Sequence, residues 1–133
     1  MNDPFLAPGN SFNRLLDEYD KHGSLVIGVD FDGTFHDYHK EGHVYPKVLN
    51  LLDDLVSIGC KIIICTAYPD LSYVQKYVDD NDIPCHGINT DGIPFPWESR
   101  KPFFSALLDD RAGLIQVYDE LRLIVDMVKS RTL

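Results

Sequence analysis

The sequence has little cysteine and no long apolar run. Its three cysteines, Cys60, Cys65 and Cys85, cannot form a closed set of disulfides, and we expect buried thiols in a reducing compartment. No apolar run approaches the roughly 18–20 residues that cross a bilayer. The first four residues, MNDP, do not lead from basic residues into an apolar segment, so we expect no secretory signal. These absences predict a cytoplasmic protein without a membrane partner.

Positive charge is also scarce, which restricts the possible partners. The chain has 12 Lys and Arg residues against 21 Asp and Glu residues, for a net charge of −9. An acidic field disfavours nonspecific binding to nucleic acid or anionic lipid, although it does not exclude nucleic acid as a partner. It suits a protein that gathers divalent cations.

What is present is the composition of a folded globular chain. Apolar residues make up 44% of the sequence and charged residues 25%, which excludes a wholly disordered chain. A length of 133 residues is enough to bury a core without disulfides or metals as staples. We therefore predict one domain that spans residues 1–133.

Strand-like runs alternate with helix-like stripes along the chain. Apolar runs predict buried strands over 25–29, 61–65 and 104–108, and a further strand over 83–88. Helical spacing predicts four helices. They run from a cap at Asn10 or Ser11 to Gly23, after Pro46 up to Gly59, after a cap at Asp70, and onward from Gly113. This order predicts an α/β fold, a single-domain Rossmann-like three-layer sandwich whose mainly parallel sheet is covered on both faces.

Three of the predicted strands end in a polar residue: Asp30, Thr66 and Asp109. Ligands of open α/β sheets bind beyond the carboxyl ends of the strands, so we expect these three ends to meet in one crevice. Gly33 permits a sharp turn that can bring Asp32 back over the same place.

Up to four carboxylates would converge in this crevice: Asp30, Asp32, Asp109 and Asp110. Such a cluster repels itself unless a cation neutralises it, and carboxylate oxygens suit Mg²⁺. The cluster therefore predicts Mg²⁺ as a cofactor.

Lys101 and Thr66 add the remaining parts of a phosphoryl-transfer site. A lysine, a hydroxyl and backbone N–H groups next to carboxylates and a metal are what such chemistry needs. Each residue also has a plainer interpretation. Thr66 is then a structural turn hydroxyl, Lys101 an exposed loop charge, and Asp110 a cap of the last helix.

Four segments together resemble the motifs of haloacid dehalogenase-like (HAD) hydrolases, in that family's order. LVIGVDFDGT (25–34) resembles the first motif and ICTAYP (64–69) the second. Lys101 in RKPFF resembles the third, and LLDDRAG (107–113) resembles the paired-Asp form of the fourth. The intervals between the motifs leave no room for a cap domain, so the resemblance implies a small capless member.

The resemblance also implies catalytic roles. Asp30 would attack phosphorus and form an aspartyl-phosphate, and Asp32 would protonate the leaving oxygen and then activate water. Thr66 and nearby backbone N–H groups, with Ala67 as the candidate, would hold the phosphoryl oxygens. Lys101 would offset the charge shared by Asp30 and the phosphate.

The same resemblance implies a ligand set for the metal. Asp30, the backbone carbonyl of Asp32, and Asp109 would hold Mg²⁺, and Asp110 would bind it directly or through water. The sequence does not decide between these two roles of Asp110.

We thus expect a Mg²⁺-dependent phosphomonoester hydrolase. Its substrate would be a small phosphorylated molecule or the phosphorylated end of a larger one. Two alternatives stay open. One is a phospho-accepting receiver-like signalling domain, although receivers carry the acceptor Asp in the middle of the chain. The other is a catalytically inactive HAD-like binding module.

Several histidines and aromatic residues lie near the motifs in the sequence. His36, His39 and His43 fit no closed zinc pattern and predict a solvated flap beside the site, from which His36 can still touch substrate. Trp97 forms a lip of the site or a packed loop, and Tyr68 narrows the entrance.

Overall fold

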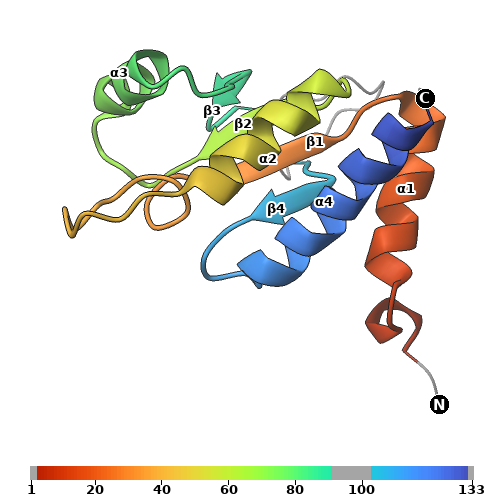
Figure 1. The fold of residues 1–133 in the computed structure, drawn as a ribbon. Helices are drawn as coiled ribbons and strands as arrows, with labels where there is room; N and C mark the ends of the chain where they lie inside the picture. The colour runs from red at the N-terminus through yellow and green to blue at the C-terminus, as the bar shows by residue number, and fades with distance from the viewer. Residues whose placement is uncertain (1–2, 91–102, 132–133) are drawn as a thin grey trace.

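The central feature of the fold is a parallel sheet, in a computed structural model that describes residues 3–90 and 103–131. Within these residues the sheet has four strands in the order β3-β2-β1-β4. Their bounds are Val26–Asp30 for β1, Lys61–Cys65 for β2, Gly87–Ile88 for β3 and Ala106–Leu108 for β4 (Figure 1). All three pairings are parallel. The chain therefore has the predicted α/β, Rossmann-like fold.

Strand order creates a switch point at β1. The chain moves from β1 to β2 and β3 on one side and then returns to β4 on the other side. Val29 is level with both Ile64 and Leu108, so the carboxyl ends of the three strands lie at one height. This is the position at which open α/β sheets bind ligands.

Four helices and a short 3₁₀ turn accompany the described strands. They are η1 (Pro4–Leu6), α1 (Asn10–His22), α2 (Pro46–Ser57), α3 (Leu71–Asp80) and α4 (Leu114–Ser130). Pro46 is the first residue of α2, where its fixed φ suits a helix start. The predicted cap of α3 is confirmed, because the Asp70 side chain accepts hydrogen bonds from the Ser72 and Tyr73 N–H groups.

The predicted cap of α1 is wrong. Gly9, in the left-handed region, takes the cap position and no side chain caps the helix. The Ser11 hydroxyl instead donates to the Glu120 carboxylate on α4. Ser11, which the local pattern assigned to the helix cap, therefore makes a tertiary contact instead.

Two predicted strands are shorter than expected. The 83–88 strand forms only at Gly87–Ile88, since Pro84 has no N–H for the ladder and the His86 ring accepts the Ile62 N–H in place of a carbonyl. The 104–108 strand forms at 106–108, and the Ser105 hydroxyl accepts from the Val26 N–H just before it.

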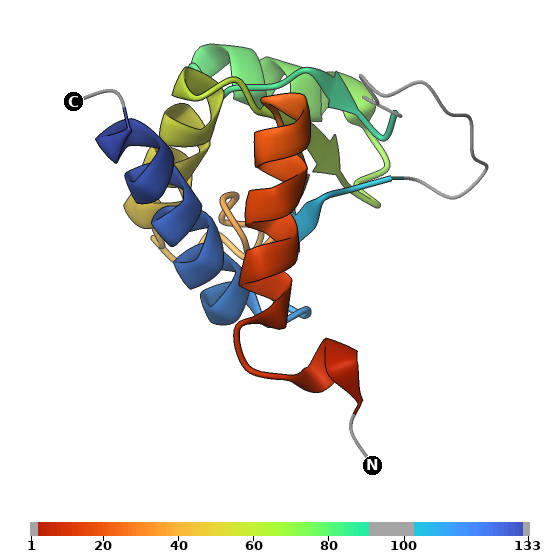
Figure 2. The ribbon, with the colours of Figure 1, turned by 90° about the vertical axis from the view of Figure 1, so that its right-hand side faces the viewer.

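The main core lies between one face of the sheet and the helices. Buried residues of all four helices join Ile27, Val29, Ile62 and Ile64 in one cluster. In Figure 1, α2 and α4 lie side by side across this face, and Figure 2 shows α1 beside α4. This core holds Ile27 and Val29 of β1, whereas Asp30 at the carboxyl end of the strand lies outside the apolar cluster.

The other face of the sheet is covered differently. Val26 and Ile63 point to this face and pack against Phe103 and Phe104. A Cβ on Gly28 would lie 2.9 Å from the Phe104 ring, so the glycine of the first motif admits this close contact. In residues 3–90 and 103–131 the second face is thus covered by aromatic side chains and not by a helix. No helix in these ranges is long and apolar enough to cross a membrane.

Candidate functional site

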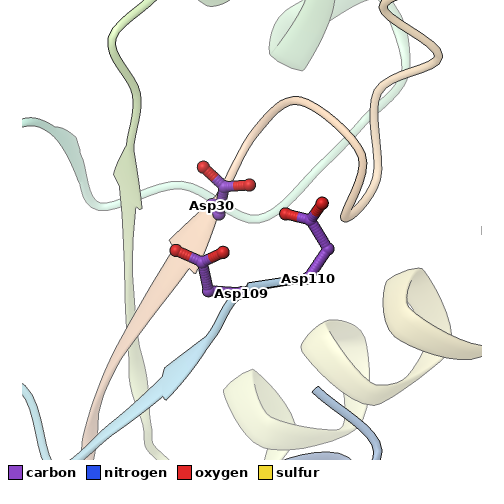
Figure 3. A group of neighbouring side chains, drawn as sticks. All are labelled: Asp30, Asp109 and Asp110. Carbon is purple, nitrogen blue, oxygen red and sulfur yellow. The ribbon is translucent and has the colours of Figure 1, made fainter. Parts of the chain in front are cut away.

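The carboxylates of Asp30, Asp109 and Asp110 gather at the switch point. Each offers an oxygen atom that lies within 4.8 Å of those of the other two. Figure 3 shows the three side chains grouped at the ends of β1 and β4. Asp30 comes from the end of β1 and the other two follow β4. Asp30 and Asp109 are half-buried, whereas Asp110 is exposed. We call these three residues the carboxylate triad.

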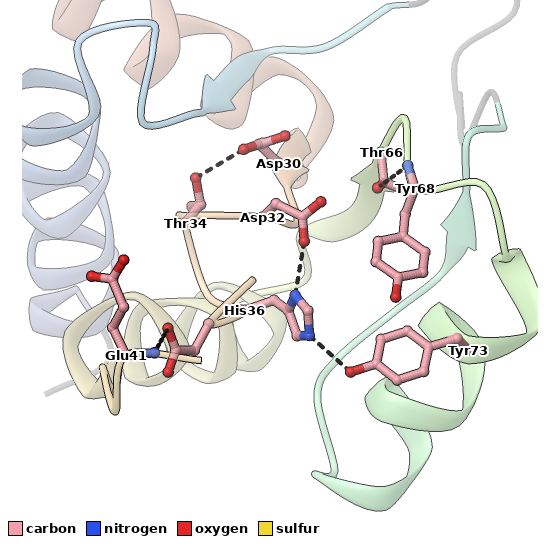
Figure 4. Close-up of polar contacts among 9 residues, drawn as sticks. Asp30, Asp32, Thr34, His36, Glu41, Thr66, Tyr68 and Tyr73 are labelled. Atoms are coloured by element: carbon pink, nitrogen blue, oxygen red, sulfur yellow. Dashed lines mark hydrogen bonds and ion pairs between the residues drawn. The ribbon is translucent and has the colours of Figure 1, made fainter. Parts of the chain in front are cut away.

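Thr34 holds two residues of the triad in position by hydrogen bonds. Its buried hydroxyl donates to Asp30 Oδ2 at 3.3 Å and accepts from the Asp110 N–H at 3.1 Å. One side chain therefore holds two members of the triad that lie far apart in the sequence. The contact with Asp30 is drawn in Figure 4. Sequence reasoning quoted Thr34 in the first motif but gave it no role.

Gly33 makes room for this arrangement. Its φ of +82° is in the left-handed region, and a Cβ there would lie 2.9 Å from Asp110 Oδ2. A side chain at this position would strain the turn and displace a carboxylate of the triad. The glycine of the DGT sequence is thus explained by both its conformation and its neighbour.

The triad is electrostatically unfavourable in the absence of a cation. Burial, a hydrogen bond with Asp110 and the nearby charges of Asp109 and Asp110 raise the pKa of Asp30 to about 7. The Thr34 hydroxyl acts in the opposite direction, because it stabilises the charged form. These oxygen ligands fit a hard divalent cation such as Mg²⁺.

Asp32 does not join the triad, although we expected its carboxylate to converge with the other three. Its Oδ1 instead lies 2.8 Å from His36 Nδ1, and His36 Nε2 lies 2.9 Å from the Tyr73 hydroxyl. Figure 4 shows this chain leading away from Asp30. The two aspartates of the first motif therefore have different surroundings.

The predicted solvated histidine flap is wrong for His36. That ring is 7% exposed and stacks on Phe31, with centroids 4.2 Å apart. The burial of His36 was not predicted because segment 31–45 is polar in sequence. A histidine packed between aromatic rings gives no periodic hydrophobic pattern. His39 and His43 are exposed, as predicted. They line a cleft that the three residues of the triad also line.

Thr66 and Ala67 line the same cleft. The Asn89 side chain, which sequence reasoning missed, accepts the Thr66 N–H at 2.8 Å and donates to the Thr66 carbonyl at 2.9 Å. The Thr66 hydroxyl in turn accepts from the Tyr68 N–H at 2.9 Å. Among the described residues, neither the Thr66 hydroxyl hydrogen nor the Ala67 N–H has an acceptor, so both can donate to a ligand.

The cleft has a volume of about 960 Å³, and part of its lining comes from the loop that follows the first motif. Asp37 organises this loop, because its carboxylate accepts from the N–H groups of Glu41, Gly42 and His43. Arg111 also lines the cleft, a role that the sequence did not suggest.

Not every predicted site residue falls within the described part of the chain. Lys101 and Trp97 lie outside it. The alternative of Asp110 as the cap of the last helix is wrong, because Gly113 takes that position without a side-chain bond.

Comparison with known proteins supports the fold. No family model and no curated protein matches the chain. Among solved structures, it is similar to a conserved protein coded by a locus of Bacteroides thetaiotaomicron. The two share 24% identity over 81% of this chain and 92% of that chain, with a TM-score of 0.58. Likeness at this identity bears on architecture alone, and it agrees with the α/β topology.

Proposed function

We propose that the protein is a Mg²⁺-dependent phosphomonoester hydrolase that acts through an aspartyl-phosphate. The observation that carries this proposal is the carboxylate triad at the switch point of the sheet. Its charge needs a cation, and one of its members ends the central strand, where a ligand meets the sheet. The four motif-like segments of the sequence point to the same chemistry.

Asp30, Asp109 and Asp110 would hold the metal, with the backbone carbonyl of Asp32 as a further candidate ligand. The fit is supported by the raised pKa of Asp30, which is caused by burial, by the hydrogen bond with Asp110 and by the nearby charges of Asp109 and Asp110. When bound, Mg²⁺ would neutralise charge on the phosphoryl oxygens and on the triad.

Asp30 and Asp32 would share the chemistry between them. An Asp30 oxygen would form a bond to phosphorus as the bond from phosphorus to the leaving oxygen breaks, and the Asp32 proton would pass to that oxygen. The oxygen of a water molecule would then form a bond to phosphorus as the bond from phosphorus to the Asp30 oxygen breaks, and the water would give one proton to Asp32. Inorganic phosphate leaves and both side chains return to their starting states.

The separate surroundings of Asp32 support this division of labour. A residue that exchanges protons should not be fixed on a cation as a carboxylate ligand, and Asp32 Oδ1 is held by His36 outside the triad. Asp32 Oδ2 has no hydrogen-bond partner among the described residues and would carry the proton. Thr66, Ala67 and Arg111 line the cleft where the phosphoryl oxygens would lie. The third motif-like segment adds Lys101, which lies outside the described residues, as the residue that would offset the phosphate charge.

Hydrolysis of an aryl phosphate at pH 7.5 tests the proposal. We expect phosphate release that needs Mg²⁺, stops with excess chelator, and is absent in Asp30→Asn. A protein that takes up acetyl phosphate as a stable phospho-form, without turnover, would be a receiver-like domain instead. Binding of phosphate with neither reaction would indicate an inactive module.

A further inference from the structure

A second hollow lies beside the cleft, and its walls are mostly aromatic. It has a volume of about 520 Å³, and five of its seven lining residues carry rings. We call it the tyrosine hollow. These five are His36, Tyr38, Tyr68, Tyr73 and Tyr77. The proposed chemistry uses none of the four tyrosines.

The rings of the tyrosine hollow are held in place before any ligand binds. Tyr68 and Tyr73 stack on one another with centroids 5.0 Å apart, and Tyr38 meets Tyr68 nearly at a right angle. The Tyr73 hydroxyl is bonded to His36 Nε2. Tyr38 nevertheless remains 54% exposed, so its ring is available to a ligand. Rigid aromatic walls bind flat partners with little loss of side-chain entropy.

The tyrosine hollow continues the cleft on the side where a leaving group would lie. Asp37 and Tyr38 line both spaces. Figure 4 shows Asp32 between Asp30 and the Tyr68 and Tyr73 rings. In an in-line displacement the leaving oxygen is opposite the nucleophile. A leaving group protonated by Asp32 would therefore extend toward these tyrosines.

The charges of the tyrosine hollow favour an uncharged occupant. Its described lining has one carboxylate, Asp37, and one ammonium, Lys40. The Asp37 carboxylate is already satisfied by three backbone N–H groups. One exposed lysine does not make the cationic cluster that a second phosphate requires. Ring faces and hydroxyls instead suit a flat group with a few polar edges.

We infer that the tyrosine hollow binds a planar, uncharged ring carried by the leaving group of a phosphomonoester. This inference rests on the proposed function, because it takes the phosphoryl group to lie at the carboxylate triad. A nucleobase and a phenyl ring share the required chemistry, and the experiment distinguishes them.

Two matched pairs of substrates test the ring preference. Uridine 5′-monophosphate against ribose 5-phosphate isolates a nucleobase, and 2-phenylethyl phosphate against ethyl phosphate isolates a phenyl ring. Every leaving oxygen is a primary alcohol, so within each pair the ring is the main difference. We expect kcat/KM to be at least about tenfold higher for the ring-bearing member of one pair, as loss of one aromatic stack would imply. Ratios near one in both pairs would overturn the inference.

Three variants connect the preference to the tyrosine hollow. Tyr38→Ala should bring the ratio close to one, whereas Tyr38→Phe, which keeps the ring, should retain most of it. Leu123→Ala, on an exposed side chain of α4, is the matched control and should leave the ratio as in the wild type. An unchanged ratio in Tyr38→Ala would contradict the assignment.

A binding measurement separates failure of this inference from failure of the proposed function. Uridine 5′-monophosphate and 2-phenylethyl phosphate are titrated into Asp30→Asn with Mg²⁺ present, and tyrosine ring signals are followed by NMR. If the wild type hydrolyses nothing but binding depends on Tyr38, the function is wrong and the ring site stands. Hydrolysis without ring preference leaves the function and removes the ring site. If neither ligand binds and nothing is hydrolysed, both are wrong.

Discussion

The two ends of strand β1 differ sharply in what surrounds them. Toward its start, Val26 and Ile27 are fully buried in apolar clusters, and the Val26 N–H is satisfied by Ser105. At its other end, Asp30 faces two further carboxylates, and its pKa is raised to about 7. One end therefore stabilises the fold, while the other stores unfavourable charge that a ligand can relieve. Strain of this kind is typical of functional sites.

The sharpest way to test this comparison is Asp30→Asn, for which activity and stability should move in opposite directions. We expect turnover to fall by roughly 10³-fold or more, because an amide is a poor nucleophile. We also expect the metal-free protein to melt at the same or a higher temperature, since the amide removes charge repulsion. Steady-state kinetics and thermal denaturation in chelator measure the two effects. Retained turnover, or a clear drop in melting temperature, would contradict the contrast.

Asp32→Asn should separate the two aspartates of the first motif. With an aryl phosphate, which departs without a proton, attack by Asp30 should survive in part. Breakdown of the aspartyl-phosphate should slow by roughly 10²–10⁴-fold without a base. Rapid-mixing experiments should then show a burst of phenol of at most about one equivalent per site, followed by a stall. With an alkyl phosphate even the burst should be slow. Unchanged turnover on both substrates would remove the acid/base role.

Substitutions in the apolar core should lower the free energy of unfolding strongly, whereas substitutions at the charged end should mainly lower activity. Leu55→Ala, in the core at the end of α2 away from the triad, should cost about 2–5 kcal/mol in the free energy of unfolding. Leu123→Ala, an exposed leucine of α4, should change it by less than about 0.5 kcal/mol. Urea denaturation compares them. Equal costs for the two variants would mean that the helical layer is not the source of stability.

The pH dependence of stability should reveal the stored charge. Asp30 keeps its proton up to about pH 7 when folded but releases it near 3.8 when unfolded. The folded state binds more protons between these values, so the free energy of unfolding should fall as pH rises through this window. We expect a loss of roughly 1–2 kcal/mol, reduced by solvent screening of this partly exposed group.

Denaturation in chelator at pH 5 and pH 8 measures this loss, with Asp30→Asn as the control. The control should lack the part of the decline that belongs to Asp30. Added Mg²⁺ should restore stability at pH 8 more than at pH 5, because protons compete with the cation for Asp30. A decline of the same size in both proteins would assign it to other groups.

The smallest expected effect concerns Thr34, which connects Asp30 to the Asp110 backbone. Thr34→Val keeps the buried shape but removes the hydroxyl between Asp30 and the Asp110 N–H. We expect a cost of about 1–2 kcal/mol in stability and a Mg²⁺ affinity weaker by several-fold. Thr34→Ser, which keeps the hydroxyl, should retain the affinity. Isothermal titration with Mg²⁺ measures it, and equal affinities for both variants would make the Thr34 contact incidental.

Local pattern predicted the elements better than their ends. The strand over 61–65 is confirmed, whereas α2 begins at Pro46 itself and not after it. The cap at Asn10 or Ser11 failed because Ser11 found a partner on α4, which no local rule anticipates. The strand over 83–88 was overextended, since its ladder is interrupted by Pro84 and by the His86 ring.

By itself, the sequence determined that three polar strand ends would meet at one edge of a parallel sheet. This is because apolar runs set the strands, and parallel strands bring their carboxyl ends together. Only the tertiary structure decided that Asp32 leaves the predicted carboxylate cluster for His36, and that Thr34 and Asn89 hold the site. Some of these contacts join residues distant in the chain, and others bury a histidine within a loop whose sequence is polar. They depend on packing in three dimensions, on which periodicity carries no information.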